Sequence, residues 1–234
     1  MKKLSLVIPC YNESESIPEL LESCNEAFYG KDVEVVIVDN GSTDNTQEVI
    51  SKLLGKYKFV TLVSVKKNIG YGHGIVQGLN KASGEILGWT HADLQTNPVD
   101  AIEGLNFFNN NTNTFVKGKR YGRPILDILF TIGMSFFETL LMKTRMWDIN
   151  AQPALFHRSF FDSWKNPPDD FSLDLFVYFI AKKEGLNIKR FPVLFSDRVY
   201  GKSHWNVNFS GKYKFIKRTL QYSFLLKQRF KGSA

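Results

Sequence analysis

Short apolar runs and helical patterns alternate four times along the first half of the chain. The apolar runs cover residues 4–9, 33–38, 60–65 and 86–88, and each is short enough to form a buried strand. Strands that alternate with helices through short connections pair in parallel and carry the helices on both faces of the sheet. The sequence therefore predicts an α/β fold with a doubly wound, mainly parallel sheet.

Polar or glycine-rich segments follow each of these predicted strands. In chain order they are Tyr11 with Glu13, Asp39, the glycine-rich residues 68–74, and His91 with Asp93. Open α/β sheets bind ligands in the crevice outside the carboxyl ends of their strands. We therefore expect these groups to line one ligand crevice.

His91, Asp93 and Gln95 alternate in the segment after the fourth run. In extended backbone, alternate side chains lie on one face, so the three are expected to point the same way. Asp93 and Gln95 offer oxygen ligands suited to Mg²⁺ or Mn²⁺, and the imidazole of His91 is better suited to Mn²⁺. The pattern predicts a metal site that neutralises a diphosphate; the alternative is that Asp93 caps a helix beginning near Pro98.

The second half of the chain is less regular. Residues 114–119 resemble a strand that leads to Arg120, and a helix with Leu173 and Ile180 on its inner face ends at Gly185. Residues 187–195 predict an edge strand, because they contain a proline. We predict one domain over residues 1–210 and a tail over residues 211–234.

The net charge of +7 is concentrated at the C-terminal end. After Asp197 there are nine Lys or Arg residues and no acid, whereas the preceding residues carry 21 basic and 23 acidic groups. This distribution argues against nucleic-acid binding by the whole domain and favours a local anionic partner such as a membrane surface. Residues 212–231 interleave basic with apolar side chains, which predicts an amphipathic helix lying on anionic lipid or, alternatively, packing on the domain.

Two cysteines, Cys10 and Cys24, provide neither a disulfide framework nor a zinc-binding spacing. The first predicted strand begins at once, which leaves no room for a signal peptide, so we expect a cytosolic protein. The longest apolar stretch, residues 128–137, is shorter than the roughly 20 residues of a membrane-spanning helix. We expect it to be buried or to lie in a bilayer interface.

Several common enzyme motifs are absent or incomplete. Gly70, Gly72 and Gly74 do not have the spacing of a dinucleotide-binding loop, and they either let the backbone approach a nucleotide or form a tight turn. Lys202 and Ser203 resemble the end of a phosphate-binding loop, but Ser196 stands where its first glycine belongs. The chain has no Gly-x-Ser-x-Gly elbow. A dehydrogenase, an ATPase and a serine hydrolase are therefore disfavoured.

The motifs together resemble those of family 2 glycosyltransferases, in the same order and spacing. They are Ile8-Pro9-Cys10-Tyr11-Asn12-Glu13, Val38-Asp39-Asn40-Gly41-Ser42-Thr43-Asp44-Asn45-Thr46, Asn68-Ile69-Gly70-Tyr71-Gly72 with Gly78, and Ala92-Asp93-Leu94-Gln95. The most similar branch is that of dolichol-phosphate mannose synthase, which uses polyprenyl-phosphate acceptors. Further support comes from Gly118-Lys119-Arg120-Tyr121, from Asp148 and from Arg198-x-x-Gly201-Lys202-Ser203.

The resemblance implies a GT-A fold, which is Rossmann-like, and an inverting transfer of a sugar from a nucleotide-sugar with Mn²⁺ or Mg²⁺ as cofactor. It implies that the nucleotide is held by Pro9, Tyr11, Glu13, Asp39, Gly70 and Ala92, and the metal by Asp93 and Gln95, with His91 beside them. The acceptor phosphate or the leaving diphosphate would meet Arg120, Arg198, Lys202 and Ser203. Asp148 would either hold acceptor groups or stabilise a turn.

One position departs from the family pattern, which usually has Asp-x-Asp at the metal. This chain has His91-Ala92-Asp93 instead, so one carboxylate is lost. Either Asp93 and Gln95 suffice with the diphosphate and water, or His91 shifts the preference toward Mn²⁺, or the protein has lost activity.

The acceptor chemistry separates the remaining alternatives. A phosphate monoester, with a second pKa of about 6, is already a nucleophilic dianion at neutral pH, whereas a sugar hydroxyl needs a carboxylate base. The candidate bases are Asp169, Asp170 and Asp174, which also suit the start of a helix. We predict transfer from a GDP- or UDP-sugar to a polyprenyl phosphate at the cytosolic membrane face. The alternatives are a hydroxyl acceptor in polysaccharide synthesis and a non-catalytic nucleotide-sugar binding protein.

Overall fold

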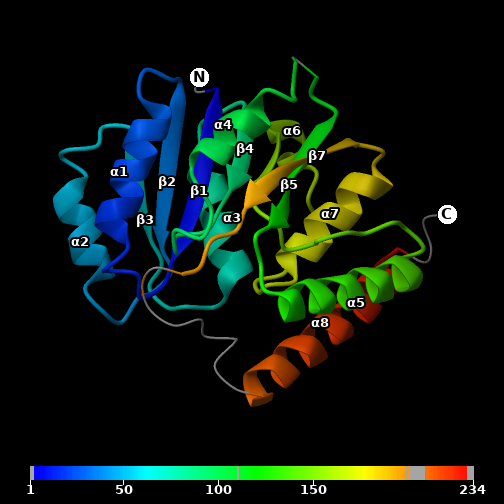
Figure 1. Ribbon diagram of the computed structural model, residues 1–234. Coiled ribbons are helices and arrows are strands. Elements are labelled where there is room, and N and C mark those ends of the chain that lie inside the picture. Colours follow the sequence, from blue (N-terminus) through cyan, green and yellow to red (C-terminus); the bar gives the residue numbers. More distant parts are fainter. Residues whose placement is uncertain (1–2, 110, 199, 201–208, 231–234) are drawn as a thin grey trace.

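The four predicted strands of the first half lie side by side and pair in parallel, as their apolar patterns predict (Figure 1). The computed structural model describes residues 3–109, 111–198, 200 and 209–230. The four strands are β1 (Leu4–Cys10), β2 (Val33–Asp39), β3 (Val60–Ser64) and β4 (Ile86–Trp89). Their carboxyl ends therefore lie along one edge of the sheet.

Three more strands extend this sheet beyond β4. They are β5 (Thr114–Tyr121), β6 (Ala154–His157) and β7 (Asn187–Leu194), and the described sheet has the order β3-β2-β1-β4-β6-β5-β7. The sheet is mainly parallel, but β6 runs antiparallel to β4 and β5. β6 was not predicted, because four residues carry no readable periodicity. Pro192 lies in β7 at the edge, as predicted.

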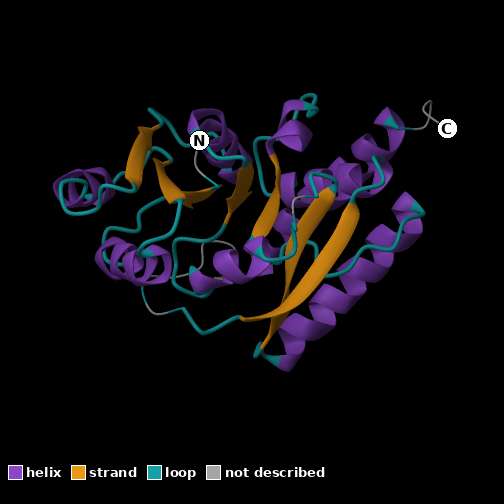
Figure 2. Ribbon diagram, turned by 90° about the horizontal axis from the view of Figure 1, so that it is seen from above, coloured by secondary structure: helices purple, strands orange, loops and turns teal. Residues whose placement is uncertain are grey.

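Helices cover both faces of the sheet, so the domain has three layers (Figure 2). Those on one face are α1 (Ile17–Phe28), α2 (Thr46–Leu53) and α4 (Val99–Leu105). Those on the other are α3 (Tyr71–Lys81), α6 (Arg158–Asp162) and α7 (Leu173–Lys183). Along β1, Leu6 and Ile8 enter the first core and Val7 the second, as the two-residue period of a strand requires.

Two long helices, α5 (Ile125–Met142) and α8 (Phe209–Arg229), pack against each other below the second face (Figure 1). The rings of Phe137 and Phe224 meet edge to face, with centroids 6.4 Å apart, and Leu226 is buried. The predicted C-terminal helix is thus present, and it packs on the domain, which was the alternative to lying on lipid.

Helix α5 is longer and more exposed than the sequence suggested. It has 18 residues with a mean hydropathy of 1.7, and only 17% of them are buried. The expectation that this stretch is too short to cross a membrane was wrong, because the helix extends well beyond residues 128–137 and its length and composition allow a span. Its most exposed apolar side chains are Ile125, Leu126, Leu129, Phe136 and Leu140.

Candidate active site

The ends of β1 and β2 place the nucleotide candidates next to one another. Cys10 and Asp39 are partners in the register of the two strands, and the amide of Asn40 donates to the Cys10 carbonyl at 2.9 Å. Asp39 is buried, and its Oδ1 accepts the amide N–H of Ser42 at 3.0 Å. This bond fixes the carboxylate at the end of β2, and Pro9 and Tyr11 at the end of β1 are half-buried.

Arg198 joins two predicted subsites that lie far apart in the sequence. Its guanidinium forms an ion pair with Glu13, and its Nη1 lies 3.9 Å from Oδ2 of Asp93. Burial raises the pKa of Glu13, although the positive charge of Arg198 acts in the opposite direction. The structure therefore brings Glu13, Asp93 and Arg198 into one cluster. The sheet-edge argument predicted this proximity for Glu13 and Asp93.

The segment of the predicted metal ligands is a turn, not an extended strand. β4 ends at Trp89, and Leu94 has a φ of 61°. The expectation that His91, Asp93 and Gln95 share one face of an extended segment was therefore wrong. The alternative for Asp93 is also wrong, since α4 has no side-chain cap and Asp93 instead accepts the amide N–H of Gln95 at 3.2 Å.

His91 is held by a stack of aromatic rings. Its ring lies 6.2 Å from that of Tyr71, which in turn stacks on Phe171 at 4.6 Å. Burial lowers the pKa of His91, against the opposing charges of Asp93 and Asp174. The imidazole is therefore neutral at pH 7, which leaves a lone pair available for a metal ion.

The donor set at this turn fits a divalent cation that arrives with further oxygen ligands. Among the described residues, no group of three His, Cys, Asp or Glu side chains is arranged to hold a metal. Asp93 supplies a carboxylate and His91 an imidazole, while the side-chain N–H of Gln95 donates to the Ser196 carbonyl at 3.0 Å. One carboxylate and one imidazole make a weak site alone, but they suit a cation already bound to a diphosphate.

The glycine-rich segment approaches protein backbone. A Cβ on Gly70 would lie 2.3 Å from the carbonyl oxygen of Asp169, and one on Gly72 would lie 2.3 Å from that of Pro168. The amide of His73 donates to the Asp169 carbonyl at 2.8 Å. These glycines thus let the backbone pack closely against residues 168–170. The two predicted roles were a nucleotide contact and a tight turn, and this packing was not predicted. Ala92 is buried next to the metal candidates.

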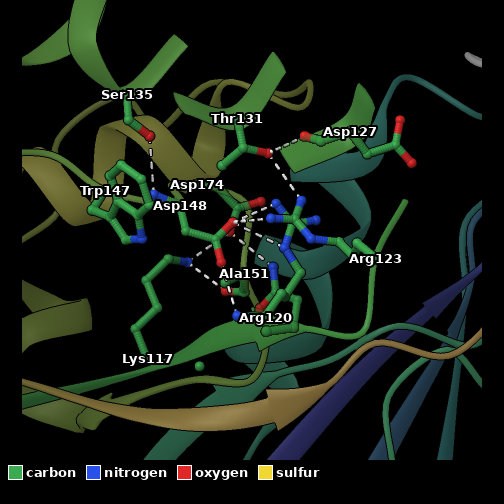
Figure 3. A network of polar contacts seen from close by, with 12 residues as sticks. Lys117, Arg120, Arg123, Asp127, Thr131, Ser135, Trp147, Asp148, Ala151 and Asp174 are labelled. Carbon is green, nitrogen blue, oxygen red and sulfur yellow. Dashed lines mark hydrogen bonds and ion pairs between the residues drawn. The ribbon is translucent and has the colours of Figure 1, made fainter. Parts of the chain in front are cut away.

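Asp148 lies at the centre of a cluster of guanidinium groups (Figure 3). Its carboxylate accepts from Arg120 through the backbone N–H at 2.9 Å, through Nε at 2.9 Å and through Nη2 at 2.5 Å. Arg123 and Arg190 each approach it to 3.9 Å. These cations hold the pKa of Asp148 below its usual range, although burial acts to raise it. Asp148 therefore orients Arg120 and leaves a net positive charge.

Asp174 is a buried carboxylate with two partners. Lys117 Nζ lies 3.4 Å from its Oδ1, and Gln152 donates to the same oxygen at 2.8 Å. The side chains of Lys117 and Asp174 are 1% and 2% exposed, so the pair is cut off from solvent. Burial lowers the pKa of Lys117 to about 8, and its Nζ also donates to the Ala151 carbonyl at 2.7 Å (Figure 3). The carboxylate is thus already neutralised.

Sequence reasoning missed the partners of the predicted residues. Lys117, Arg123 and Arg190 were not singled out, because nothing in their local pattern shows which carboxylate they meet. The available signal for Lys117 was a lysine in the middle of a predicted strand, and residues 114–118 of β5 are indeed all buried. Lys202 and Ser203 lie outside the described residues, so their predicted roles stay predictions.

Comparison with curated proteins shows two similar relatives. An undecaprenyl-phosphate 4-deoxy-4-formamido-L-arabinose transferase from Yersinia enterocolitica is 36% identical over 108 residues, which are 45% of this chain and 33% of that protein. A dolichol-phosphate mannosyltransferase from Pyrococcus furiosus is 34% identical over 119 residues, 51% of this chain and 33% of that protein. The matches thus span about a third of the length of these relatives.

Solved structures share the fold at low sequence identity. The mannosyltransferase PcManGT from Pyrobaculum calidifontis, in complex with GDP-Man and Mn²⁺, has a TM-score of 0.66 and 21% identity, covering 86% of this chain and 58% of that one. Glucosyl-3-phosphoglycerate synthase from Mycobacterium tuberculosis, in complex with UDP, has a TM-score of 0.74 and 17% identity, covering 97% and 80%. These likenesses confirm the predicted GT-A fold.

A family model matches a longer part of the chain than these relatives do. The model of glycosyl transferase family 2 matches residues 5–166, which is more than half of the chain and includes β1 to β6 and the turn that follows β4. The motifs at the strand ends lie within this match. The chain therefore belongs to glycosyl transferase family 2.

Proposed function

We propose that the protein transfers a sugar from a GDP- or UDP-sugar to the phosphate of a polyprenyl-phosphate lipid. An acceptor phosphate oxygen would attack the anomeric carbon, and the bond from that carbon to the diphosphate would break with inversion. The named relatives support this lipid class, since one is an undecaprenyl-phosphate sugar transferase and the other a dolichol-phosphate mannosyltransferase.

The choice of a phosphate acceptor rests on one observation, which is how the three candidate bases are paired with neighbouring side chains. Asp174 is paired with Lys117 and Gln152. Asp170 accepts the amide N–H of Ser172 at 2.8 Å and is paired with Arg218 at 3.1 Å. Both carboxylates are thus already engaged by a cation and by an amide donor instead of facing an acceptor hydroxyl. A hydroxyl acceptor needs a base, whereas a phosphate dianion does not.

Asp169, the third candidate, is 63% exposed and lies 3.3 Å from His73. Asp169 is more exposed than Asp170 and Asp174 and lies next to an imidazole, so we do not assign it as the base. Arg120, held by Asp148, and Arg198 would position the acceptor phosphate and the departing diphosphate, since guanidinium forks suit phosphate oxygens. Lys202 and Ser203 would join them.

On the donor side, Pro9, Tyr11, Glu13 and Asp39 would hold the base and ribose, with Gly70 and Ala92 close by. His91, Asp93 and Gln95 would hold Mn²⁺ or Mg²⁺ on the diphosphate. A divalent cation there would offset the negative charge that develops on the leaving group. Arg198, which already lies beside Asp93, would add a fixed positive charge at the same place.

A lipid acceptor calls for contact with a membrane. The exposed apolar side of α5 and the exposed side chains of α8, which include Lys217, Phe224 and Leu225, suit an anionic membrane surface. We propose peripheral association with the cytosolic face, where nucleotide-sugars would be supplied.

The test is a transfer assay with Mn²⁺, polyprenyl phosphate and a panel of GDP- and UDP-sugars. We expect a labelled lipid product that mild acid cleaves, and a rate roughly 10- to 100-fold lower for Arg120→Gln, as is typical when a positioning cation is lost. Lys119→Gln is the matched control, because Lys119 is exposed next to Arg120 on the same strand.

Donor hydrolysis without a lipid product would overturn the phosphate acceptor and favour a saccharide hydroxyl. Donor binding without any turnover at saturating Mn²⁺ would favour a non-catalytic binding protein. An equal loss in Arg120→Gln and Lys119→Gln would overturn the role of Arg120.

A further inference from the structure

Glu138 is a buried carboxyl group at the contact between α5 and α8. Its side chain is 0% exposed, although most of α5 faces outward. Ser223 of α8, which is also fully buried, lies with its Oγ 2.6 Å from Oε1 of Glu138. The other carboxyl oxygen, Oε2, is buried and has no hydrogen-bond partner among the described residues.

The hydroxyl of Ser223 lies between two acceptors. Its Oγ is 2.6 Å from Glu138 and 2.8 Å from the carbonyl oxygen of Thr219. A hydroxyl has one proton and can donate to only one of them. Both contacts are satisfied at once if Glu138 carries a proton: the carboxyl O–H then donates to Ser223, and Ser223 donates to Thr219. An ionised Glu138 would leave one short contact without a proton.

We propose that Glu138 is protonated while α8 is packed on α5, and that its ionisation loosens α8 from α5. We call the contact of Glu138 with Ser223 the clasp. This inference goes beyond the proposed function and does not depend on it, since it concerns how the two helices are held together.

No described charge offsets an ionised Glu138. The charged or titratable side chains described on the elements around it are Asp127 on α5, Lys143 and Arg145 just after α5, Asp174, Tyr178, Lys182 and Lys183 on α7, and Lys217, Arg218, Tyr222, Lys227 and Arg229 on α8. Within the described residues, none of the cations forms an ion pair with Glu138; Arg218 is paired with Asp170, and Arg229 donates to the Asn166 carbonyl. A charge at this place would be both buried and unpaired.

The pH range over which α8 loosens follows from the pKa of Glu138 in the packed state and in the separated state. Burial raises the pKa of Glu138 to about 7, against a smaller opposing effect of the Ser223 hydrogen bond. Once α8 has separated, the carboxyl group returns to an ordinary glutamate pKa of about 4.3. Between these values the packed state binds more protons than the separated one, so separation becomes about tenfold more favourable per pH unit and levels off above about pH 7.

Hydrogen–deuterium exchange of the full chain tests the clasp from pH 5 to 7.5, with rates corrected for the intrinsic pH dependence of exchange. We expect the protection of amides in residues 216–229 to fall about tenfold per pH unit between pH 5 and 7. Residues 173–183 of α7 are the internal reference and should keep their protection. Glu138→Gln, which keeps the shape without the charge, should give protection of α8 that does not change with pH.

Glu26→Gln is the matched control, since Glu26 is exposed on α1 and should leave the wild-type profile unchanged. Constant protection of α8 in the wild type, or the same pH dependence in Glu138→Gln, would overturn the clasp. If Glu138→Gln does not fold, Glu138→Met replaces it: constant and higher protection supports the clasp, and the wild-type pH dependence refutes it.

Discussion

Asp174 is a candidate base whose carboxylate is already engaged by two neighbouring side chains. Its Oδ1 is shared by Lys117 and Gln152 inside the domain. Removing one member of a buried ion pair leaves the other charge without compensation, which typically costs about 3–5 kcal/mol. The loss of stability must therefore be separated from any loss of chemistry.

For Asp174→Asn we predict a lower free energy of unfolding, by up to about 3 kcal/mol, because Lys117 is left unpaired and sheds its proton. The transfer rate per folded molecule should fall less than about tenfold, since a phosphate acceptor needs no base. Urea unfolding and transfer kinetics measure the two effects. Asp170→Asn, which changes a second candidate base just before α7, should likewise keep the rate within about tenfold. A loss of several orders of magnitude in rate alone would point to a hydroxyl acceptor.

We propose that His91 sets which metal the turn after β4 binds. A carboxylate suits Mg²⁺, whereas an imidazole favours Mn²⁺. We predict that His91→Asp raises the affinity for Mg²⁺ relative to Mn²⁺ by about tenfold or more, measured by competition for bound Mn²⁺ in the presence of a nucleoside diphosphate. His157→Gln, on β6, should leave the ratio unchanged. An unchanged ratio in His91→Asp would show that His91 is not a ligand.

At the scale of elements, the periodic apolar pattern of the sequence predicted which helix positions are buried. The predicted inward positions of α7, Leu173 and Ile180, are both buried. β6 has four residues, too few to show an alternation of apolar and polar side chains. The turn after β4 was wrongly predicted as extended, because alternating residue types occur in turns as well as in strands. The ion pairs at Asp148 join residues 25 to 42 positions apart, and such pairing leaves no local signal.

The exposed side of α5 carries the membrane proposal. Leu126 and Leu129 are 79% and 57% exposed, so acidic residues there should not disturb the core. We predict that Leu126→Glu with Leu129→Glu lowers binding to phosphatidylglycerol-containing vesicles by about tenfold or more, because apolar area and charge attraction are both lost. Co-sedimentation measures the binding, and thermal unfolding should be unchanged.

Tyr29→Glu is the control for this experiment, because Tyr29 is 84% exposed at the end of α1. Binding that is unaffected by the two α5 substitutions would exclude this side of α5 as the membrane contact. Resistance of the wild type to carbonate extraction would instead favour insertion of α5 over peripheral association.

At the scale of the whole molecule, one sheet joins a parallel half, which carries the donor candidates, to a second half that carries Arg120 and Asp148. The two halves meet where β4 and β6 pair antiparallel over four residue pairs. Arg158, which follows β6, reinforces this join: its guanidinium donates to the carbonyl of Gly84 at 2.7 and 2.9 Å and to that of Ala82 at 2.8 Å. The two halves are thus joined by four residue pairs and by the hydrogen bonds of Arg158.

We predict that Arg158→Ala lowers the free energy of unfolding by about 2 kcal/mol, because hydrogen bonds from a charged donor are lost and two carbonyls are left without that donor. Arg158→Lys should recover only part of this, since an ammonium group lacks the planar fork that reaches both carbonyls. Urea unfolding should remain a single transition, as the halves share one sheet. Lys52→Ala, which removes an exposed pair with Glu48, should leave the midpoint unchanged. Two separate transitions in Arg158→Ala would mean that the halves fold independently and that this join does not hold them together.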